Sequence, residues 1–457
     1  MIQPRCTASE SSAEERSLVY FCTNTSVQFA APFGNEFWTC LVLQIAERER
    51  SVRQAIVALG ALHESFRDEH LTLHPNPQLS EGTLRKTNWA LTHLATSSYA
   101  KALHELNRHI LPNTWDGLHV SLLCCILFTS FEWLRGSYAA AIIHLKSGLN
   151  ILRQWTSTAT SPNTPTAHFI RRQIGPMFVR LSIQARTFSE DVTPMPWLST
   201  GTLAFTDNND AQNKEQHLRA ARIALDAVCG EVYLQPSNLM LVTANFTLSP
   251  PIVLEFSLRL AKWCAEYHMH LLPVIPIPLK EEMPRPENIN LTVWYTMLGV
   301  LQATSMTEDP MKFDAYTPQF TRVVQLTRLL VGSNRFTTNT LGTPRFRIDM
   351  ETVPMLYHVA SKCRHPVLRR EAIALLRSSA NREGLWDGWA VAKLAEEIMS
   401  VEEEGLEDVE RQGAEDVPAR QRVCKLEEVT DLQARMMRVR FMRWEEEDYG
   451  EWRVLTW

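Results

Sequence analysis

The sequence predicts an all-α protein: a multi-helix bundle of stacked helical hairpins with a small C-terminal β-hairpin. Three observations lead to this fold class. Apolar residues recur at the three-to-four-residue spacing of one helix face over most of the chain. Glycine and proline stand where these patterns stop. Alternation of apolar and polar residues, which is typical of strands, occurs only near the end.

The N-terminal half contains the clearest helical patterns. Residues 37–66 predict a pair of helices, and Ser51 with Gln54 forms a capping-box pattern at the start of the second helix. Three longer helices follow, at residues 89–110, 118–135 and 137–155. The helix at 118–135 is apolar nearly all round, so we expect it to be buried in the core.

Two of these helices resemble each other. Segments 99–107 and 138–146 both begin Tyr-Ala-x-Ala and carry small residues where another helix could approach. This favours stacked hairpins like those of tetratricopeptide arrays, whose period is about 34 residues. The offset here is 39 residues and only two copies are found, so a true repeat array is the less favoured alternative.

The second half shows further helical patterns, separated by proline-containing breaks. The run at residues 272–278 contains three prolines. It therefore cannot be helical and marks a boundary. The helices are predicted at about residues 170–188, 212–231, 250–272, 290–306, 321–330, 353–363, 366–379 and 388–404.

The patterns divide the chain into four parts. Residues 1–28 are polar and unpatterned, which predicts a mobile segment, and residues 29–400 form the helical domain. Residues 401–430 are predicted to be an acidic linker, because acid dominates from 396 to 416; an acidic contact surface for another protein is the alternative. Residues 431–457 alternate around a polar, glycine-containing turn and predict a β-hairpin annex.

Composition narrows the class of protein. The 457 residues are 45% hydrophobic, enough for a large core, and the net charge of -5 shows no basic footprint of a whole DNA-binding domain. Nine widely spaced cysteines suit a reducing compartment. The start lacks a signal-peptide pattern, and the longest apolar run is well short of the ~20 residues that span a bilayer. We therefore expect an intracellular protein with no membrane span.

Candidate residues for chemistry are few. His63, His70 and His74 lack an evident third metal ligand, and His268 and His270 lie on different helix faces, so all five are interpreted as surface histidines. The sequence contains no phosphate-binding glycine loop, nucleophile elbow or C-x-x-C pair. We predict no catalytic residue, no cofactor-binding residue and no metal ligand. An enzyme that uses His63, His104 or His144 is the minor alternative.

Basic residues form two short runs. One is residues 364–370, at a predicted helix start, and the other is the set Arg435, Arg438, Arg440 and Arg443. Both are interpreted as solvated or acid-pairing surfaces. Binding of nucleic acid by either run is the weaker alternative.

Several segments together resemble the helical middle domain of fungal zinc-cluster (Zn2Cys6) transcription factors. The first is Phe37-Trp38, followed by the sequence SVRQAIVALGALHE at 51–64. The others are residues 99–103, 120–128, 132–136, 144–149, 355–364, 369–376 and 382–387. The likeness covers roughly residues 29–457, and the order of the segments is more specific than any one of them.

The sequence departs from that family in its first 40 residues. The family's DNA-reading module has six cysteines that hold two zinc ions, whereas this segment has only Cys6, Cys22 and Cys40. No zinc ligand therefore carries over, and direct DNA binding is not expected. An incomplete gene model of a DNA-binding activator, with the cluster encoded upstream, is the alternative.

The resemblance implies a nuclear transcription regulator, with the cytoplasm as the alternative location. It further implies control of a fungal specialised-metabolite gene cluster through protein or ligand binding. The expected partners are other transcriptional regulators or a zinc-cluster protein, a second copy in a homodimer, and a small-molecule effector.

Overall fold

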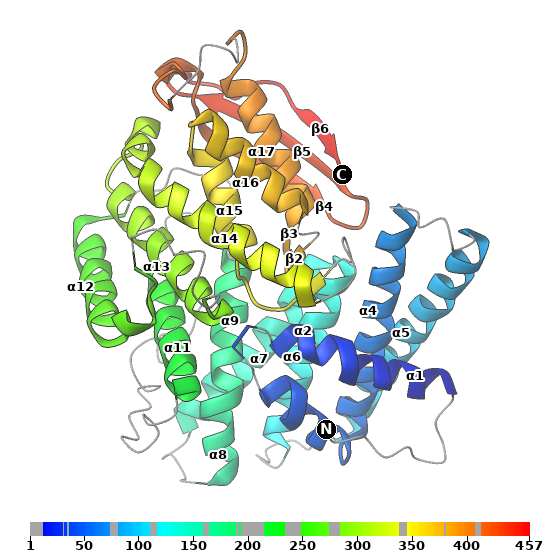
Figure 1. The fold of residues 1–457 in the computed structure, drawn as a ribbon. Helices are drawn as coiled ribbons and strands as arrows, with labels where there is room; N and C mark the ends of the chain where they lie inside the picture. Colours follow the sequence, from blue (N-terminus) through cyan, green and yellow to red (C-terminus); the bar gives the residue numbers. More distant parts are fainter. Residues whose placement is uncertain are drawn as a thin grey trace. The chain divides into compact units, whose positions relative to one another are not determined.

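The computed structural model of the protein is mainly helical, with small sheets toward the C-terminal end (Figure 1). It describes residues 12–30, 32–33, 36–73, 81–109, 117–158, 164–188, 192, 214–233, 248–273, 284–337, 345–378, 381–406 and 413–457. The predicted all-α class with a small C-terminal β element is confirmed. Residues 1–11 of the predicted mobile segment lie outside the described residues, whereas residues 12–28 are helical, contrary to the expectation of an unpatterned segment.

The chain forms two compact units, and the boundary between them falls inside helix α9. The first unit comprises residues 1–182 and 343–349. Its elements are α1 (Ser12–Tyr20), η1 (Phe21–Thr25), α2 (Ser26–Ala30), η2 (Phe37–Leu41), α3 (Val42–Ala46), α4 (Arg50–Leu73), α5 (Glu81–His109), α6 (Leu118–Arg135), α7 (Tyr138–Thr158), α8 (Pro165–Phe169), η3 (Ile170–Ile174), the start of α9 (Gly175–Arg186) and the short strand β1 (Arg345–Arg347).

The second unit comprises residues 183–342 and 350–457. Its helices are α11 (Lys214–Tyr233), α12 (Pro250–Tyr267), η5 (His268–His270), α13 (Pro286–Thr304), η6 (Pro310–Tyr316), α14 (Thr317–Thr337), α15 (Val353–Lys362), α16 (Pro366–Ser378), α17 (Gly388–Glu402) and η8 (Ala419–Gln421). Its strands are β2 (Asn381–Glu383), β3 (Trp386–Asp387), β4 (Val423–Asp431), β5 (Met436–Arg443) and β6 (Arg453–Thr456).

Helix α6 is the central helix of the first unit, as its apolar sequence predicts. Every residue from Leu122 to Leu134 is buried. Gly136 has a left-handed φ of 82° and donates its backbone N–H to Glu132 and Trp133, which ends the helix as a glycine cap does. By length and composition α6 could cross a membrane, but 83% of that stretch is buried inside the protein, as in the core helix of a globular domain.

The segment 382–387 links two helices of the second unit. The carboxylate of Glu383 is fully buried and accepts hydrogen bonds from the backbone N–H groups of Glu351, Thr352 and Val353, at the start of α15. A carboxylate at a helix N-terminus satisfies free donors and complements the helix dipole. Asp387 caps α17 in the same way, accepting from Trp389 and Ala390.

The C-terminal sheet is larger than the predicted hairpin. It has three antiparallel strands in the order β4-β5-β6, and α17 packs against it. Residues 423–430, which are predicted to belong to an acidic linker, lie in β4. Lys425, Glu427 and Val429 share one face of β4. The charges of Lys425 and Glu427 resemble those of a solvated segment, and this concealed the alternation.

Candidate functional site

A buried carboxylate joins the end of α17 to the start of β4. Glu402 is fully buried and accepts a 2.8 Å hydrogen bond from Arg364 Nη2, together with a short bond from Arg369 Nη2. Its Oε1 also accepts from the backbone N–H of Val423, at 2.9 Å. Burial would raise the pKa of Glu402, but the two guanidinium groups outweigh it and lower the pKa to about 2. The sheet is therefore fixed to the helices by a charged cluster.

The basic run at residues 364–370 and the acidic run at residues 396–416 both contribute to this cluster. The acid-pairing interpretation of residues 364–370 is confirmed: Arg370 also binds Glu403, at 2.7 Å. The interpretation of the acidic run as solvated linker is wrong for Glu402, because this residue lies inside α17 and is fully buried. Residues 407–412 of that run lie outside the described residues.

Three basic residues lie around the ring of Phe313, beside this cluster. The ammonium groups of Lys312 and Lys362 lie 5.1 and 5.7 Å from the centre of the ring, and His358 meets its edge. Desolvation, reinforced by Arg364, lowers the pKa of Lys362 to about 7, and burial lowers that of His358 to about 3. Among the described residues, neither ring nitrogen of His358 has a hydrogen-bond partner.

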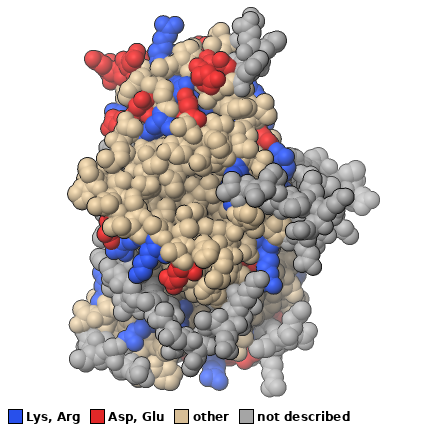
Figure 2. Space-filling view, turned by 60° about the vertical axis from the view of Figure 1, so that its left-hand side comes forward, with Lys and Arg blue, Asp and Glu red and all other residues tan. Residues whose placement is uncertain are grey.

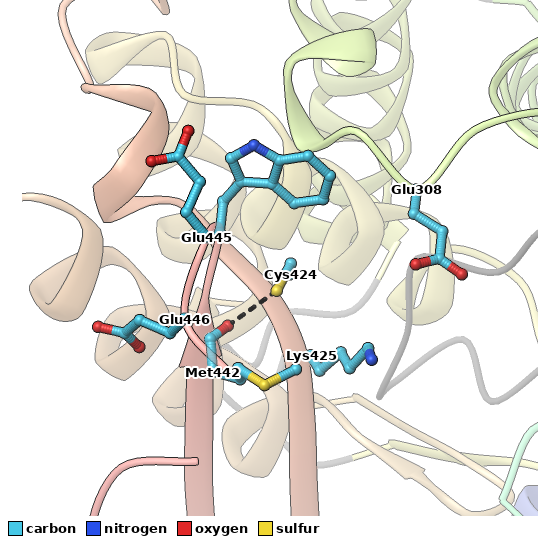
Figure 3. A pocket seen from close by; sticks show the side chains of 7 residues that line it. Glu308, Cys424, Lys425, Met442, Glu445 and Glu446 are labelled. Atoms are coloured by element: carbon cyan, nitrogen blue, oxygen red, sulfur yellow. Dashed lines mark hydrogen bonds between the residues drawn. The ribbon is translucent and has the colours of Figure 1, made fainter. Parts of the chain in front are cut away.

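A β-bulge brings Cys424 to a pocket next to this group. Val423 pairs with Arg443 and Lys425 with Met442, so Cys424 is the extra residue of β4. Bulges of this kind redirect a side chain and are common next to functional sites. The Cys424 thiol is buried and donates a 3.3 Å hydrogen bond to the carbonyl of Met442, as Figure 3 shows.

The pocket has a volume of about 410 Å³, within the range of small-molecule sites. Figure 3 shows its lining, in which Glu445 and Glu446 extend outward from the turn that follows β5. Glu445 has a φ of +72°, a left-handed conformation that costs a non-glycine residue energy and is often found at binding sites. The lining residues are Glu308, Cys424, Lys425, Met442, Trp444, Glu445 and Glu446.

The lining is suited to binding. Trp444, Met442 and Cys424 provide an apolar surface, and the carboxylates of Glu308 and Glu445 with the ammonium group of Lys425 provide charges at the margin. Burial raises the pKa of the Cys424 thiol, which makes it a poor nucleophile. Among the residues that the structure describes, no histidine lines the pocket beside that thiol. The arrangement fits a compact, largely apolar molecule with polar groups at its edge.

The histidines that the sequence singled out do not gather at one site. The prediction that His63 is a surface residue is wrong: it is fully buried and shares a 2.9 Å hydrogen bond with the hydroxyl of Thr25. Its ring fits the core because it is held neutral, since burial lowers its pKa to about 3. The side chain of His70 and the whole of His74 lie outside the described residues.

The remaining histidines also lie apart. His268 is exposed as predicted, but His270 is buried and its Nε2 lies 2.6 Å from Nδ1 of His217. His104 is exposed on α5, whereas His144 shares a 2.7 Å hydrogen bond with the hydroxyl of Tyr99. Within the part of the chain that the structure describes, no three His, Cys, Asp or Glu side chains form a group that could hold a metal ion.

The arginines of β5 have partners within the sheet and from α17. Arg440 binds Glu427, at 2.7 Å from its Nε, and Arg443 binds Glu404, at 2.5 Å. Arg438 lies over the ring of Trp452, 5.0 Å from its centre. The acid-pairing interpretation is therefore confirmed for Arg440 and Arg443.

Sequence reasoning did not find the pocket. Its residues come from a loop near 308 and from two strands, and they acquire a common surface only through strand pairing and the bulge. A local signal did exist in Trp444 followed by Glu445 and Glu446, which we interpreted only as the turn of a hairpin. The turn interpretation is correct, but the cavity depends on tertiary contacts.

Comparison with known proteins finds similarity in the first part of the chain. Residues 17–230 match the fungal specific transcription factor domain. A stretch of 141 residues is 26% identical to the transcription regulator lscL of Purpureocillium lilacinum, and this alignment covers 31% of the present chain and 32% of that relative. No solved structure matches the chain.

Proposed function

We propose that this chain, which carries a fungal specific transcription factor domain at residues 17–230, is a transcription regulator that acts in the nucleus. The match to that domain is the observation that carries the proposal. The similarity to a protein described as a transcription regulator supports it, although the alignment spans about a third of either chain. The helical pattern that suggested the family lies largely in the matched region.

A small-molecule effector is the second part of the proposal. The pocket beside Trp444 lies outside the matched residues, in a sheet fixed to the helices through Glu402. An effector that fills it would contact β4, β5 and the loop that contains Glu308 at once, and would favour one arrangement of these elements over another. We infer that the chain binds this molecule, since the buried thiol of Cys424 has a raised pKa and is a poor nucleophile.

Contact with DNA is proposed to go through a partner protein. The net charge of -5 gives no general affinity for phosphate, and the basic run at 364–370 supplies Arg364 and Arg369 to a buried acid. A zinc-cluster protein would supply the base-reading contacts in such an assembly. The genes under control are proposed to be those of a specialised-metabolite cluster, which rests on the family resemblance alone.

Transcript profiling of a deletion strain tests the proposal. We expect a confined set of genes, adjacent in the genome, to change on deletion and to return with the wild-type chain. A Trp444→Ala chain should restore the basal transcripts but not their response to growth conditions. Trp89→Ala is the matched control, because Trp89 is 72% exposed on α5 and does not line the pocket.

Two outcomes would contradict the proposal at different levels. A deletion strain with unchanged transcripts would reject the regulatory function. Full restoration by Trp444→Ala, with the response intact, would reject the effector pocket and leave the regulatory function standing.

A further inference from the structure

Helix α12 has an exposed apolar stripe on the side opposite its core-facing side. Val253, Phe256, Leu260, Trp263 and Tyr267 are buried in the second unit. On the other side, Leu254 is 61% and Leu258 59% exposed, and Ala261 and Ala265 are also exposed. A surface helix normally carries polar residues there. This helix is therefore apolar on two sides, of which the described fold covers only one.

The spacing of the stripe is that of a helix–helix seam. Leu254, Leu258, Ala261 and Ala265 follow one another at steps of four, three and four residues, the repeat with which two helices pack side by side. Met269, in the 3-10 turn η5 that follows α12, is a further exposed apolar residue, at 64%. Single exposed apolar residues are ordinary, but a contiguous row marks an interaction surface.

Beyond the charged residues of α12 itself, the face of the molecule on this side carries few charges in its middle. Figure 2 turns forward the side of the molecule on which α12 lies in Figure 1, and uncharged side chains cover a broad area of this face. The charged side chains gather toward its margins. A stable protein interface needs about 800 Å² from each partner, which is more than one helix stripe supplies alone, so this wider area matters.

The order of large and small residues selects the partner. The two leucines lie in the first half of the stripe and the two alanines in the second half. If a second copy of α12 packs antiparallel, Leu258 faces Ala261 and Leu254 faces Ala265, so that each large side chain meets a small one. A parallel pair would set leucine against leucine and alanine against alanine, which fills space unevenly.

The charges beside the stripe agree with the same arrangement. Glu255 and Lys262 are seven residues apart, so they flank the stripe on one side, two helical turns from each other. In an antiparallel pair, Glu255 of one copy approaches Lys262 of the other, and the twofold symmetry repeats the contact. Glu255 keeps its bond to Arg259 within the helix, at 2.5 Å, because a carboxylate accepts several donors.

We infer that α12 is a self-association surface, on which a second copy of this chain packs with its own α12 antiparallel. Apolar area along the stripe supplies the affinity, and the Glu255–Lys262 contacts set the direction. This inference is independent of the effector pocket, which lies in the C-terminal sheet.

Sedimentation of the full chain tests the inference. The wild-type chain should be a dimer with twice its mass of 52.3 kDa. Leu258→Glu should raise the dissociation constant ~10-fold or more, because it buries a charge in an apolar contact. Ile143→Glu is the control: Ile143 is 64% exposed on α7, and its substitution should leave the dimer intact. Circular dichroism verifies that each variant is folded.

Charge reversal tests the direction of packing. Glu255→Lys alone and Lys262→Glu alone should each weaken the dimer, since like charges then face each other. A mixture of these two single variants should recover it as a heterodimer, because every contact becomes one lysine with one glutamate. A wild-type chain that stays monomeric overturns the inference, as does a dimer that Leu258→Glu leaves unchanged. Failure of the mixture to associate overturns the antiparallel arrangement.

Discussion

The cores of the two units are held together by different interactions. Around α6 in the first unit, apolar side chains fill the interior, and thirteen consecutive residues from 122 to 134 are buried. In the second unit, the interior where α15, α16, α17 and β4 meet contains Arg364, Arg369 and Glu402, all fully buried. The first core is stabilised by area removed from water and the second depends on complete pairing of charge.

The difference shows which cores tolerate change. An apolar core loses stability in a graded way that follows the volume of the cavity left behind. Neighbouring side chains relax into the cavity only in part, so the remaining empty volume sets the loss. A buried charge cluster fails abruptly, since removal of one partner leaves the others charged and unsolvated. The pocket depends on the second kind of core, because Glu402 also binds the first residue of β4.

The largest expected effect is the loss of Glu402. Glu402→Ala leaves Arg364 and Arg369 without their shared acid, and we expect it to lower the free energy of unfolding by about 3–5 kcal/mol. Chemical denaturation followed by tryptophan fluorescence measures this. The control is Glu404→Ala, because Glu404 is 70% exposed and its bond to Arg443 should contribute no more than ~1 kcal/mol. Equal losses in both variants would remove the distinction between the two cores.

The second expected effect is a cavity in the apolar core. Leu127→Ala, in the fully buried part of α6, should lower the free energy of unfolding by about 3 kcal/mol. Ile143→Ala on the exposed side of α7 should cost less than ~0.5 kcal/mol. The same denaturation assay compares them. A Leu127 variant as stable as the Ile143 variant would show that α6 is not at the centre of a packed core.

The third prediction compares two glycines within helices. A Cβ at Gly148 in α7 would lie 2.3 Å from the ring of Phe178, so Gly148→Ala should cost about 1–3 kcal/mol through overpacking. At Gly299 in α13 a Cβ meets no described atom within 4 Å, so Gly299→Ala should stabilise the helix by about 0.5–1 kcal/mol. Thermal unfolding measures the change in stability of each variant. The prediction fails if both variants are stabilised or both are destabilised.

Acid should produce an effect that is absent above neutral pH and accumulates as the pH decreases. His63 and His358, one in each unit, have a pKa near 3 when folded, against an ordinary value of 6.5, because both are buried. The unfolded chain therefore binds protons first, so stability is complete above about pH 6.5 and falls as the pH decreases toward 3. Each histidine contributes a slope of at most about 1.4 kcal/mol per pH unit. Denaturation at a series of pH values measures the slope.

Substitution of each histidine measures how much its own unit contributes to the acid response. His358→Leu should reduce the acid slope without loss at pH 8, because neither ring nitrogen has a partner among the described residues. His63→Leu should reduce the slope as well, but it should cost about 1 kcal/mol at pH 8, since Thr25 loses its hydrogen bond. An unchanged slope in both variants would show that other groups govern the acid response.

The family match and the pocket lie in different parts of the chain. The matched transcription-factor domain covers residues 17–230, whereas the pocket residues begin at Glu308. The match to that domain therefore says nothing about this pocket. The proposed role of the pocket rests on its own geometry: the bulge at Cys424, the strained turn at Glu445 and the indole of Trp444.

The helical class, the burial of α6 and the strand alternation at residues 437–443 could be predicted from the sequence alone. These features are periodic along the chain, and periodicity records which side of an element leaves water. The sequence also contained both charged runs, but only the tertiary structure decided that they pair with each other, because their attraction depends on a contact between α16 and α17. The same reason explains why β4 was interpreted as linker, why His63 was expected at the surface, and why the pocket was not foreseen. Each depends on neighbours that come from distant parts of the chain.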